Sequence, residues 1–444
     1  MTVLSCHSVK GAAMKNPLNR RRLRIFEFSI FFCVISTLCR SQSHGVVCSD
    51  GFGSFNFKST TGVTVSVGAA KNGEFAQRDC KAEFTWNQQN LMVEPDAWQV
   101  DVDLMDADLG LGAPVVALQV KRSSADPLME YDIYSLKMPP RKLRTITGGD
   151  FFRAADTNLD GRIEIWTADA GTIDNFENLP LSTFDFAPTI VLRFEKSRLV
   201  DVSSEFQPQY DRQIAMLRAQ LDARDLSDFK ASDGKLSTVS ALTVDEFHSL
   251  RITKVKVLEM VWCYLYSGRD RDAWQALAET WPSADFDRIH ESILNTRDRG
   301  IRSEIDGVSS ELSHPNSKKH ILIYDQVAGG QPARPDLPAD DWRALVETTS
   351  NTDDRKPLIP PADTRPQIIL IRRPAPPQGQ QGPLNTATIV NLVIDPAGKV
   401  WSAQIKGEPD KALIDATAGW KFVPAFKGNH AVAFREDLVV SPEQ

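Results

Sequence analysis

The C-terminal part of the chain, residues 386–440, has the clearest pattern of hydrophobic spacing. In residues 390–394, apolar side chains alternate with polar or small ones, and the period of two continues in residues 400–404, which predicts two β-strands. The residues between them, 395–398, read Asp-Pro-Ala-Gly, which is typical of a β-turn. In residues 409–420, apolar side chains recur about every third or fourth position, as on one face of an α-helix. A second pair of strands, interrupted by proline and glycine, follows. The pattern predicts a ββαββ domain with one helix packed on a sheet.

Residues 383–444 resemble the C-terminal domain of the TonB family of bacterial energy transducers. The resemblance rests on the strand-turn sequence IDPAGKV at residues 394–400 and on a W-K-F-x-P-A run followed by a glycine. The residues of this signature are Trp420, Phe422, Pro424, Ala425 and Gly428. In that family the domain recruits partners by pairing an exposed edge strand with another chain. The resemblance implies that the signature residues build the core of the domain, and that a protein partner binds at its C-terminal edge strand.

The composition is that of a folded, mostly soluble protein. Hydrophobic residues make up 42% of the chain and charged residues 25%, as in ordinary globular proteins. A length of 444 residues is enough for two to four domains with a sizeable core. The net charge is −7, and no long basic run follows the N-terminal segment, which argues against a nucleic-acid-binding protein.

The N-terminal segment, residues 1–43, has the features of an export signal. Arginines dominate residues 20–24, a largely apolar stretch follows at 25–38, and Ser43 lies at a suitable cleavage site. The apolar stretch is shorter than the roughly 20 residues of a transmembrane helix. We therefore expect a periplasmic or secreted protein. If the signal stays uncleaved, it would act as an anchor and place the protein in the inner membrane.

Cysteine usage fits an oxidising compartment. Cys48 and Cys80 flank a segment with strand character, and we predict a disulfide between them, which would stabilise the fold by about 3–4 kcal/mol. The alternative is a pair of buried thiols. Cys263 lies in an apolar helical run and is predicted to be an inert core thiol.

The chain between these ends divides into blocks with different patterns. Residues 45–205 are rich in β signals, residues 206–305 have helical spacing, and residues 306–382 are a proline-rich polar linker. One short strand is expected in the linker, at residues 368–371. Four helices are expected in the helical block, at residues 213–221, 244–266, 272–281 and 284–298. Together with the C-terminal domain, these blocks predict a multidomain α+β protein.

The segment 156–164, DTNLDGRIE, has a side-chain arrangement suited to ion binding. Oxygen-bearing side chains stand at its first, third, fifth and ninth positions, and a glycine at the sixth permits a sharp turn. Thr167 stands where a complete EF-hand has a bidentate glutamate, and residues 163–166 look like a strand. The segment is therefore more similar to the calcium loop of FG-GAP or VCBS repeats. The ligands that this resemblance implies are Asp156, Asn158, Asp160, the carbonyl of Arg162, and Glu164.

Two interpretations of this loop stay open. It either binds calcium, which we favour, or it is a structural loop held by Asx turns. A degenerate copy at residues 103–116 lacks the third carboxylate, and we assign no metal to it.

The sequence has none of the common catalytic motifs. It lacks a zinc-binding H-E-x-x-H, a G-x-S-x-G nucleophile elbow, a phosphate-binding glycine loop and a dinucleotide fingerprint, so no catalytic or cofactor-binding residue is assigned. We expect a non-enzymatic exported protein that binds a protein partner and calcium. One alternative is a TonB-type transducer anchored in the inner membrane and acting in transport across the outer membrane. The other is an exported hydrolase with a propeller-like substrate-binding domain.

Overall fold

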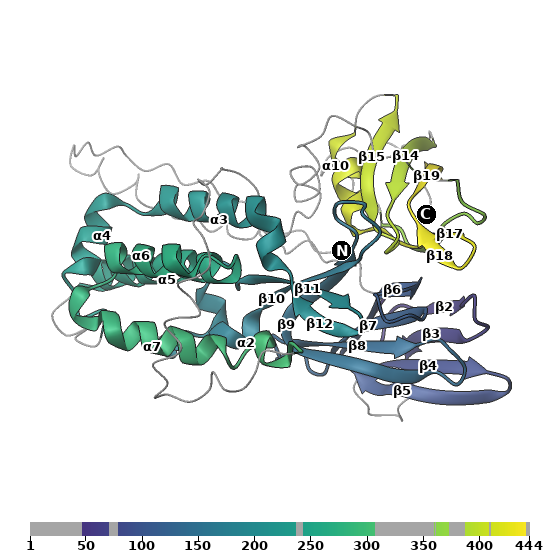
Figure 1. Cartoon of the computed structure of the whole chain (residues 1–444), viewed down its shortest axis with the longest axis horizontal. Coiled ribbons are helices and arrows are strands. Elements are labelled where there is room, and N and C mark those ends of the chain that lie inside the picture. The colour runs from purple at the N-terminus through teal and green to yellow at the C-terminus, as the bar shows by residue number, and fades with distance from the viewer. Residues whose placement is uncertain are drawn as a thin grey trace, which may run out of the picture. The chain divides into compact units, whose positions relative to one another are not determined.

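The computed structural model describes residues 47–70, 79–236, 243–306, 359, 361–372, 387–407 and 410–440. All of them belong to one compact unit, Gly45–Gln444 (Figure 1). The predicted export signal and most of the predicted linker lie outside the described residues. No helix in the described part is long and apolar enough to span a membrane.

Two antiparallel sheets account for the first half of the described chain (Figure 1). The smaller is a four-stranded meander in chain order: β2(Phe55–Lys58), β3(Thr64–Ala69), β4(Cys80–Trp86) and β5(Gln89–Ala97). The larger has eight strands in the order β1(Cys48–Ser49), β6(Gln99–Ala107), β7(Val115–Lys121), β8(Met129–Ser135), β9(Arg141–Ala155), β10(Glu164–Asp169), β11(Thr189–Glu195) and β12(Arg198–Asp201). Strands thus dominate the segment in which turns and alternating patterns predict them.

Strands β7, β10 and β11 of the eight-stranded sheet are buried on both faces, and β7 and β11 are correspondingly rich in apolar residues. In β7, Val116 and Leu118 pack with the four-stranded sheet, whereas Val115 and Ala117 belong to a different core. Successive side chains of a strand point to opposite faces, so one strand contributes to both cores.

The second core joins the eight-stranded sheet to the helices. These are α3(Gln207–Gln220), α4(Ala223–Lys230), α5(Val244–Tyr266), α6(Asp270–Thr280) and α7(Phe286–Arg297). Ile133 and Ile165 of the sheet share one buried cluster with Trp262, Trp281 and Ile293 of the helices. One core therefore spans the β-rich and helical blocks.

Helices form in all four segments with helical spacing, and α4 is an addition. A capping box of Thr243 and Glu246 starts α5, and Gly268, with a φ of +77°, follows its end. Helix α4 was missed because it has only eight residues, and its apolar face consists of just Leu226 and Phe229, too few to establish a helical period.

The C-terminal elements form a smaller layered unit, which we call the C-terminal module (residues 361–372, 387–407 and 410–440). Its elements are β13(Gln367–Leu370), β14(Thr388–Ile394), β15(Val400–Lys406), α10(Lys411–Ala416), β16(Lys421–Val423), β17(Ala425–Lys427), β18(His430–Val432) and β19(Phe434–Val440). The main sheet has the order β15-β14-β19, and the pairs β13-β16 and β17-β18 form two small sheets. The expected first hairpin, the helix and the short linker strand are all present.

The expected second pair of strands differs from the structure. In its place the structure has three strands of three residues, β16 to β18, and the seven-residue β19. The hairpin β17-β18 turns at Gly428, which has a φ of +60°. Strand β19 pairs with β14 instead, with Val439 opposite Ile389. Pro424 separates β16 from β17, and proline has no amide hydrogen with which to continue a strand ladder.

Candidate functional site

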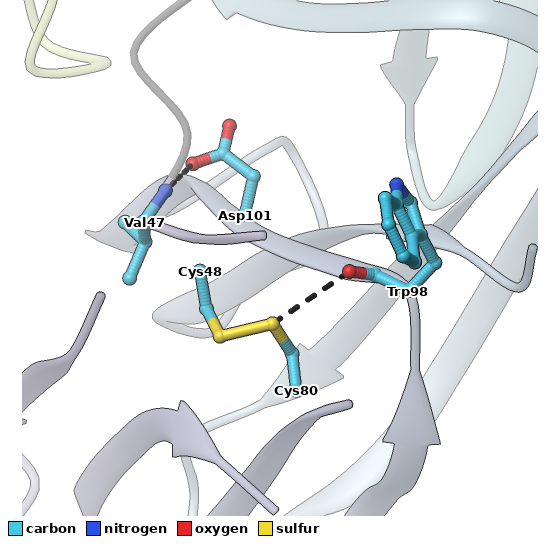
Figure 2. Close-up of a disulfide and its surroundings, with 5 residues drawn as sticks. All are labelled: Val47, Cys48, Cys80, Trp98 and Asp101. Carbon is cyan, nitrogen blue, oxygen red and sulfur yellow. Dashed lines mark hydrogen bonds between the residues drawn. A yellow bond between two sulfur atoms is a disulfide. The ribbon is translucent and has the colours of Figure 1, made fainter. Parts of the chain in front are cut away.

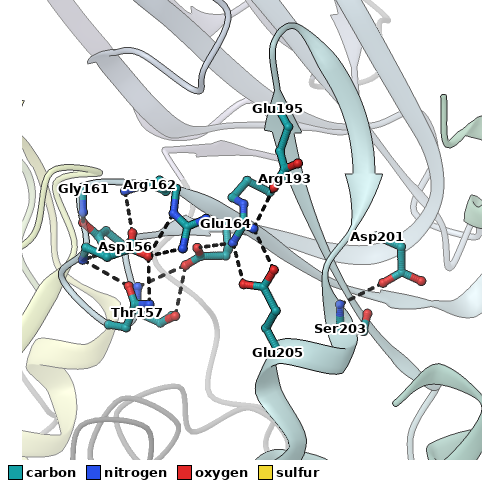
Figure 3. A network of polar contacts seen from close by, with 12 residues as sticks. Asp156, Thr157, Gly161, Arg162, Glu164, Arg193, Glu195, Asp201, Ser203 and Glu205 are labelled. Carbon is teal, nitrogen blue, oxygen red and sulfur yellow. Dashed lines mark hydrogen bonds and ion pairs between the residues drawn. The ribbon is translucent and has the colours of Figure 1, made fainter. Parts of the chain in front are cut away.

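The loop 156–164 connects β9 to β10 and is closed by its own hydrogen bonds (Figure 3). The carboxylate of Asp156 accepts the backbone N–H of Asp160 at 3.0 Å and that of Gly161 at 2.8 Å. Gly161 has a φ of +85°, which residues with a side chain rarely adopt. The sixth-position glycine therefore serves the sharp turn that the sequence predicts.

Asn158 and Asp160 lie beside Asp156 in this loop. The amide oxygen of Asn158 accepts the backbone N–H of Asp160 at 3.1 Å, and its amide nitrogen donates to Oδ2 of Asp160 at 3.0 Å. Arg162 folds back onto the same carboxylate, with Nε 2.9 Å from Oδ2. The loop thus brings together three oxygen-bearing side chains, and one of them, Asp160, already accepts a hydrogen bond from Arg162.

Glu164 begins strand β10, as the sequence predicts, and its carboxylate is fully buried. Oε2 accepts the backbone N–H and the hydroxyl of Thr157 at 3.3 and 3.1 Å, and Oε1 lies 3.5 Å from Nη1 of Arg193. Arg193 also pairs with Glu195 and Glu205, each at 2.8 Å (Figure 3). Glu164 is therefore part of a charged network behind the loop.

The loop has an acidic neighbour that sequence reasoning missed. Asp395, in the β-turn of the C-terminal module, accepts the backbone N–H of Asp156 at 2.9 Å through Oδ2. Burial and the charge of Asp395 raise the pKa of Asp156 to about 8. Burial raises the pKa of Glu164 to about 7 and that of Asp395 to about 6. The sequence signalled Asp395 only as a turn residue, because its partner lies 239 positions away.

Asp160 behaves differently. Burial raises its pKa, but hydrogen bonds from Arg162 outweigh this effect and bring the pKa below the ordinary value.

Across the described segments, no group of three or more His, Cys, Asp or Glu side chains is arranged to hold a metal ion. The oxygens of Asp156, Asn158 and Asp160 are of the hard type that calcium prefers, while Glu164 is turned towards Thr157 and Arg193. The loop thus fits a calcium ion in part.

The degenerate copy of this loop is a plain turn between β6 and β7. Oδ1 of Asp108 accepts the backbone N–H groups of Gly110, Leu111 and Gly112 at 2.8–3.0 Å. Asp106 instead accepts from Thr60.

The predicted disulfide between Cys48 and Cys80 is present (Figure 2). Its Cα atoms are 6.0 Å apart, and both residues are fully buried. The bond connects β1 of the eight-stranded sheet to β4 of the four-stranded sheet. It therefore links the two sheets covalently. Cys263 is a buried free thiol in α5, and burial raises its pKa, so it is far from a reactive thiolate.

The signature residues of the C-terminal module are mainly core residues. Trp420 and Phe422 are buried with Val390, Leu392 and Leu413, and Nε1 of Trp420 donates to the carbonyl of Arg372 at 2.8 Å. Ala425 is buried in β17, and Gly428 lies in the following turn, where its N–H donates to Asp363 at 2.6 Å.

Two buried lysines connect the C-terminal module to strand β6. Lys399, just after the β-turn, places Nζ 2.7 Å from Oδ1 of Asp103, and Lys421 of β16 pairs with Asp101. Oδ2 of Asp103 also accepts the Tyr131 hydroxyl and the backbone N–H of Ala154, each at 2.7 Å. Burial raises the pKa of Asp103, but the charges of Lys399 and Lys421 outweigh this and hold the pKa below its usual value.

Further contacts extend this interface. Nη2 of Arg153 donates to the carbonyl of Ala418 at 2.6 Å. Trp401 of β15 packs against a buried cluster that contains Trp166 and Phe206. One side of the module, including the start of β15, is thus covered by the eight-stranded sheet.

Strand β19 lies at the opposite border of the module's main sheet. It pairs with β14, and within the described residues no second strand pairs with it. Val439 is 54% exposed, and its cross-strand neighbour Ile389 is exposed as well. An edge strand presents a row of unpaired backbone N–H and C=O groups.

No family model, curated protein or solved structure matches this chain. The resemblances to the TonB C-terminal domain and to the FG-GAP loop therefore stay predictions.

Proposed function

We propose that this chain is an exported, non-enzymatic protein of the bacterial envelope that binds another polypeptide along strand β19. The border of β19 that pairs with no other strand among the described residues, with Val439 exposed beside it, carries this proposal. An extended segment of a partner would add to the sheet as a further strand, with main-chain hydrogen bonds for affinity and side-chain contacts for specificity.

The anchoring of the module favours β19 over the other border strand. Trp401 of β15 is packed against the eight-stranded sheet, so a partner strand at β15 would have to displace buried contacts. The ion pairs of Lys399 and Lys421 with β6 hold the same side of the module. A buried disulfide supports export, because such bonds persist in oxidising compartments.

Site-specific photocrosslinking tests this proposal. A photoreactive amino acid at Val439 of the full chain, expressed in cells, is expected to form a covalent adduct with another polypeptide. The matched control is Val244, which is 84% exposed at the start of α5. The proposal fails if both positions give the same adducts or if neither gives one.

Calcium binding by the loop 156–164 is a second function that we propose. The close grouping of Asp156, Asn158 and Asp160 around a turn that requires glycine favours it. These three residues would hold the ion, and the ion would offset the negative charge of Asp156 and Asp160. Calorimetric titration of the full chain with calcium should give a saturable signal that Asp160→Ala removes. Asp108→Ala, in the similar turn after β6, is the control and should keep the signal. A flat titration of the unaltered chain would refute calcium binding.

A further inference from the structure

One face of helix α5 forms a wall of a pocket of about 380 Å³. The residues of α5 that line it follow helical spacing, so they share one face. The opposite wall comes from the segment around Thr183 and Asp185, which precedes β11. The lining residues are Thr183, Asp185, His248, Arg251, Ile252, Val255 and Lys256.

Arg251 and Lys256, the two positively charged residues of this pocket, differ in whether they form an ion pair. Nζ of Lys256 lies 2.8 Å from Oδ2 of Asp185, the one carboxylate among the lining residues. Arg251 has no ion pair within the described residues. Its Nη2 donates to the neutral hydroxyl of Thr183 at 3.0 Å, and its buried Nε atom has no hydrogen-bond partner there. Among the described residues, no acidic side chain forms an ion pair with Arg251 at the wall of this pocket.

An unpaired guanidinium is a suitable recognition group for an anion. Its N–H groups form a planar fork that matches two oxygens of a carboxylate or phosphate. A half-buried guanidinium without a counter-ion also carries a desolvation cost that an anionic ligand would offset. Lys256 cannot take this role as readily, because Asp185 and Gln220 already accept from its ammonium group.

Two of the remaining pocket residues on α5 are apolar, while His248 and Lys256 are polar. Val255 is buried, and Ile252, which is 43% exposed, lies one residue after Arg251. An apolar surface beside a fixed cation suits a ligand with an anionic head and a hydrocarbon body, and the pocket volume lies in the range of small-molecule sites. We propose that this pocket binds a small amphipathic anion, a carboxylate or phosphate monoester, with its head on Arg251 and its apolar body on Ile252 and Val255. This site is independent of the partner-binding edge at β19.

Calorimetric titration of the full chain tests the site with defined probes. Octanoate and octyl phosphate share one hydrocarbon body and distinguish the two head groups, and 1-octanol has the same body without charge. We expect saturable one-to-one binding of at least one of the two anions. We expect 1-octanol to bind at least tenfold more weakly, a ratio that corresponds to about 1.4 kcal/mol.

Three variants locate the binding. Arg251→Gln should weaken binding of the anion at least tenfold, and Ile252→Asp should do the same by placing a like charge beside the head group at an exposed position that does not threaten the fold. Arg224→Gln, whose side chain is 89% exposed on α4, is the matched control and should bind as the unaltered chain does. The proposal is overturned if neither anion binds saturably, if 1-octanol binds equally well, or if Arg251→Gln and Ile252→Asp both retain the original affinity.

Discussion

The buried ion pair between Lys399 and Asp103 is expected to hold the C-terminal module onto strand β6. Both side chains are only 2% exposed, and Nζ and Oδ1 are 2.7 Å apart. At an effective dielectric constant of about 20, two unit charges at this distance attract each other by about 6 kcal/mol. Desolvation of both ions opposes this attraction, so the pair as a whole contributes far less than that. Breaking the pair from one side should nevertheless be costly.

Lys399→Met leaves the Asp103 carboxylate buried with only the Tyr131 hydroxyl and the Ala154 N–H as donors. Asp103→Asn leaves the Lys399 ammonium buried, facing a carbonyl and a neutral amide. Each single substitution removes the direct partner of one buried charge, which then has only the charge of Lys421 or Asp395 nearby. It should lower the free energy of unfolding by up to about 3–5 kcal/mol. The double variant removes both charges. Its loss in free energy of unfolding should therefore be smaller than the sum of the two single losses, by about 2 kcal/mol or more.

Urea unfolding followed by tryptophan fluorescence gives these free energies. Hydrogen exchange of the β14 and β19 amides shows whether the loss of stability extends into the C-terminal module. If the single effects add to within about 0.5 kcal/mol in the double variant, the two charges are not coupled and the explanation of this interface is wrong.

Further predictions concern the disulfide, a buried acid and the N-terminus. Replacing Cys48 and Cys80 by serine should lower the free energy of unfolding by about 3–4 kcal/mol, seen as a lower urea midpoint, because the bond closes a loop across a separation of 32 residues. An unchanged midpoint in the serine variant would contradict this. Burial raises the pKa of Glu259 to about 7, so the folded state holds this proton more tightly than the unfolded state and stability falls as pH rises from about 4.5 to 7. Glu259→Gln should flatten this decline by at most about 3 kcal/mol between pH 4 and 8, and equal pH profiles of the two proteins would rule out the assignment. N-terminal sequencing should find a mature protein that begins near Ser43, recovered in the soluble periplasmic or secreted fraction. The full-length chain in the inner membrane would favour the transducer instead.

Local patterns in the sequence were enough to predict four of the helices, the first hairpin of the C-terminal module and the β-rich character of residues 45–205. Alternation around Val390 and Leu392, the turn at residues 395–398 and the helical spacing of α5 depend on neighbours within a few positions. The turn of the loop 156–164 and the strand after it were also predictable, because Gly161 and the residues from Glu164 onward act locally. The Cys48–Cys80 disulfide was predictable because the two cysteines flank one segment with strand character.

Long-range contacts decided the rest. The apolar run of β7 does not show that alternate residues serve two different cores. Nothing near Lys399 in the sequence points to Asp103, which is 296 positions away, and Asp395 reads only as a turn residue until the fold places it against Asp156. Spacing and turn chemistry in the sequence determined many of the strands, helices and turns, but they did not reveal helix α4 or the pairing of β19 with β14. The tertiary structure alone decides which charges are buried together, because that depends on which distant surfaces pack against each other.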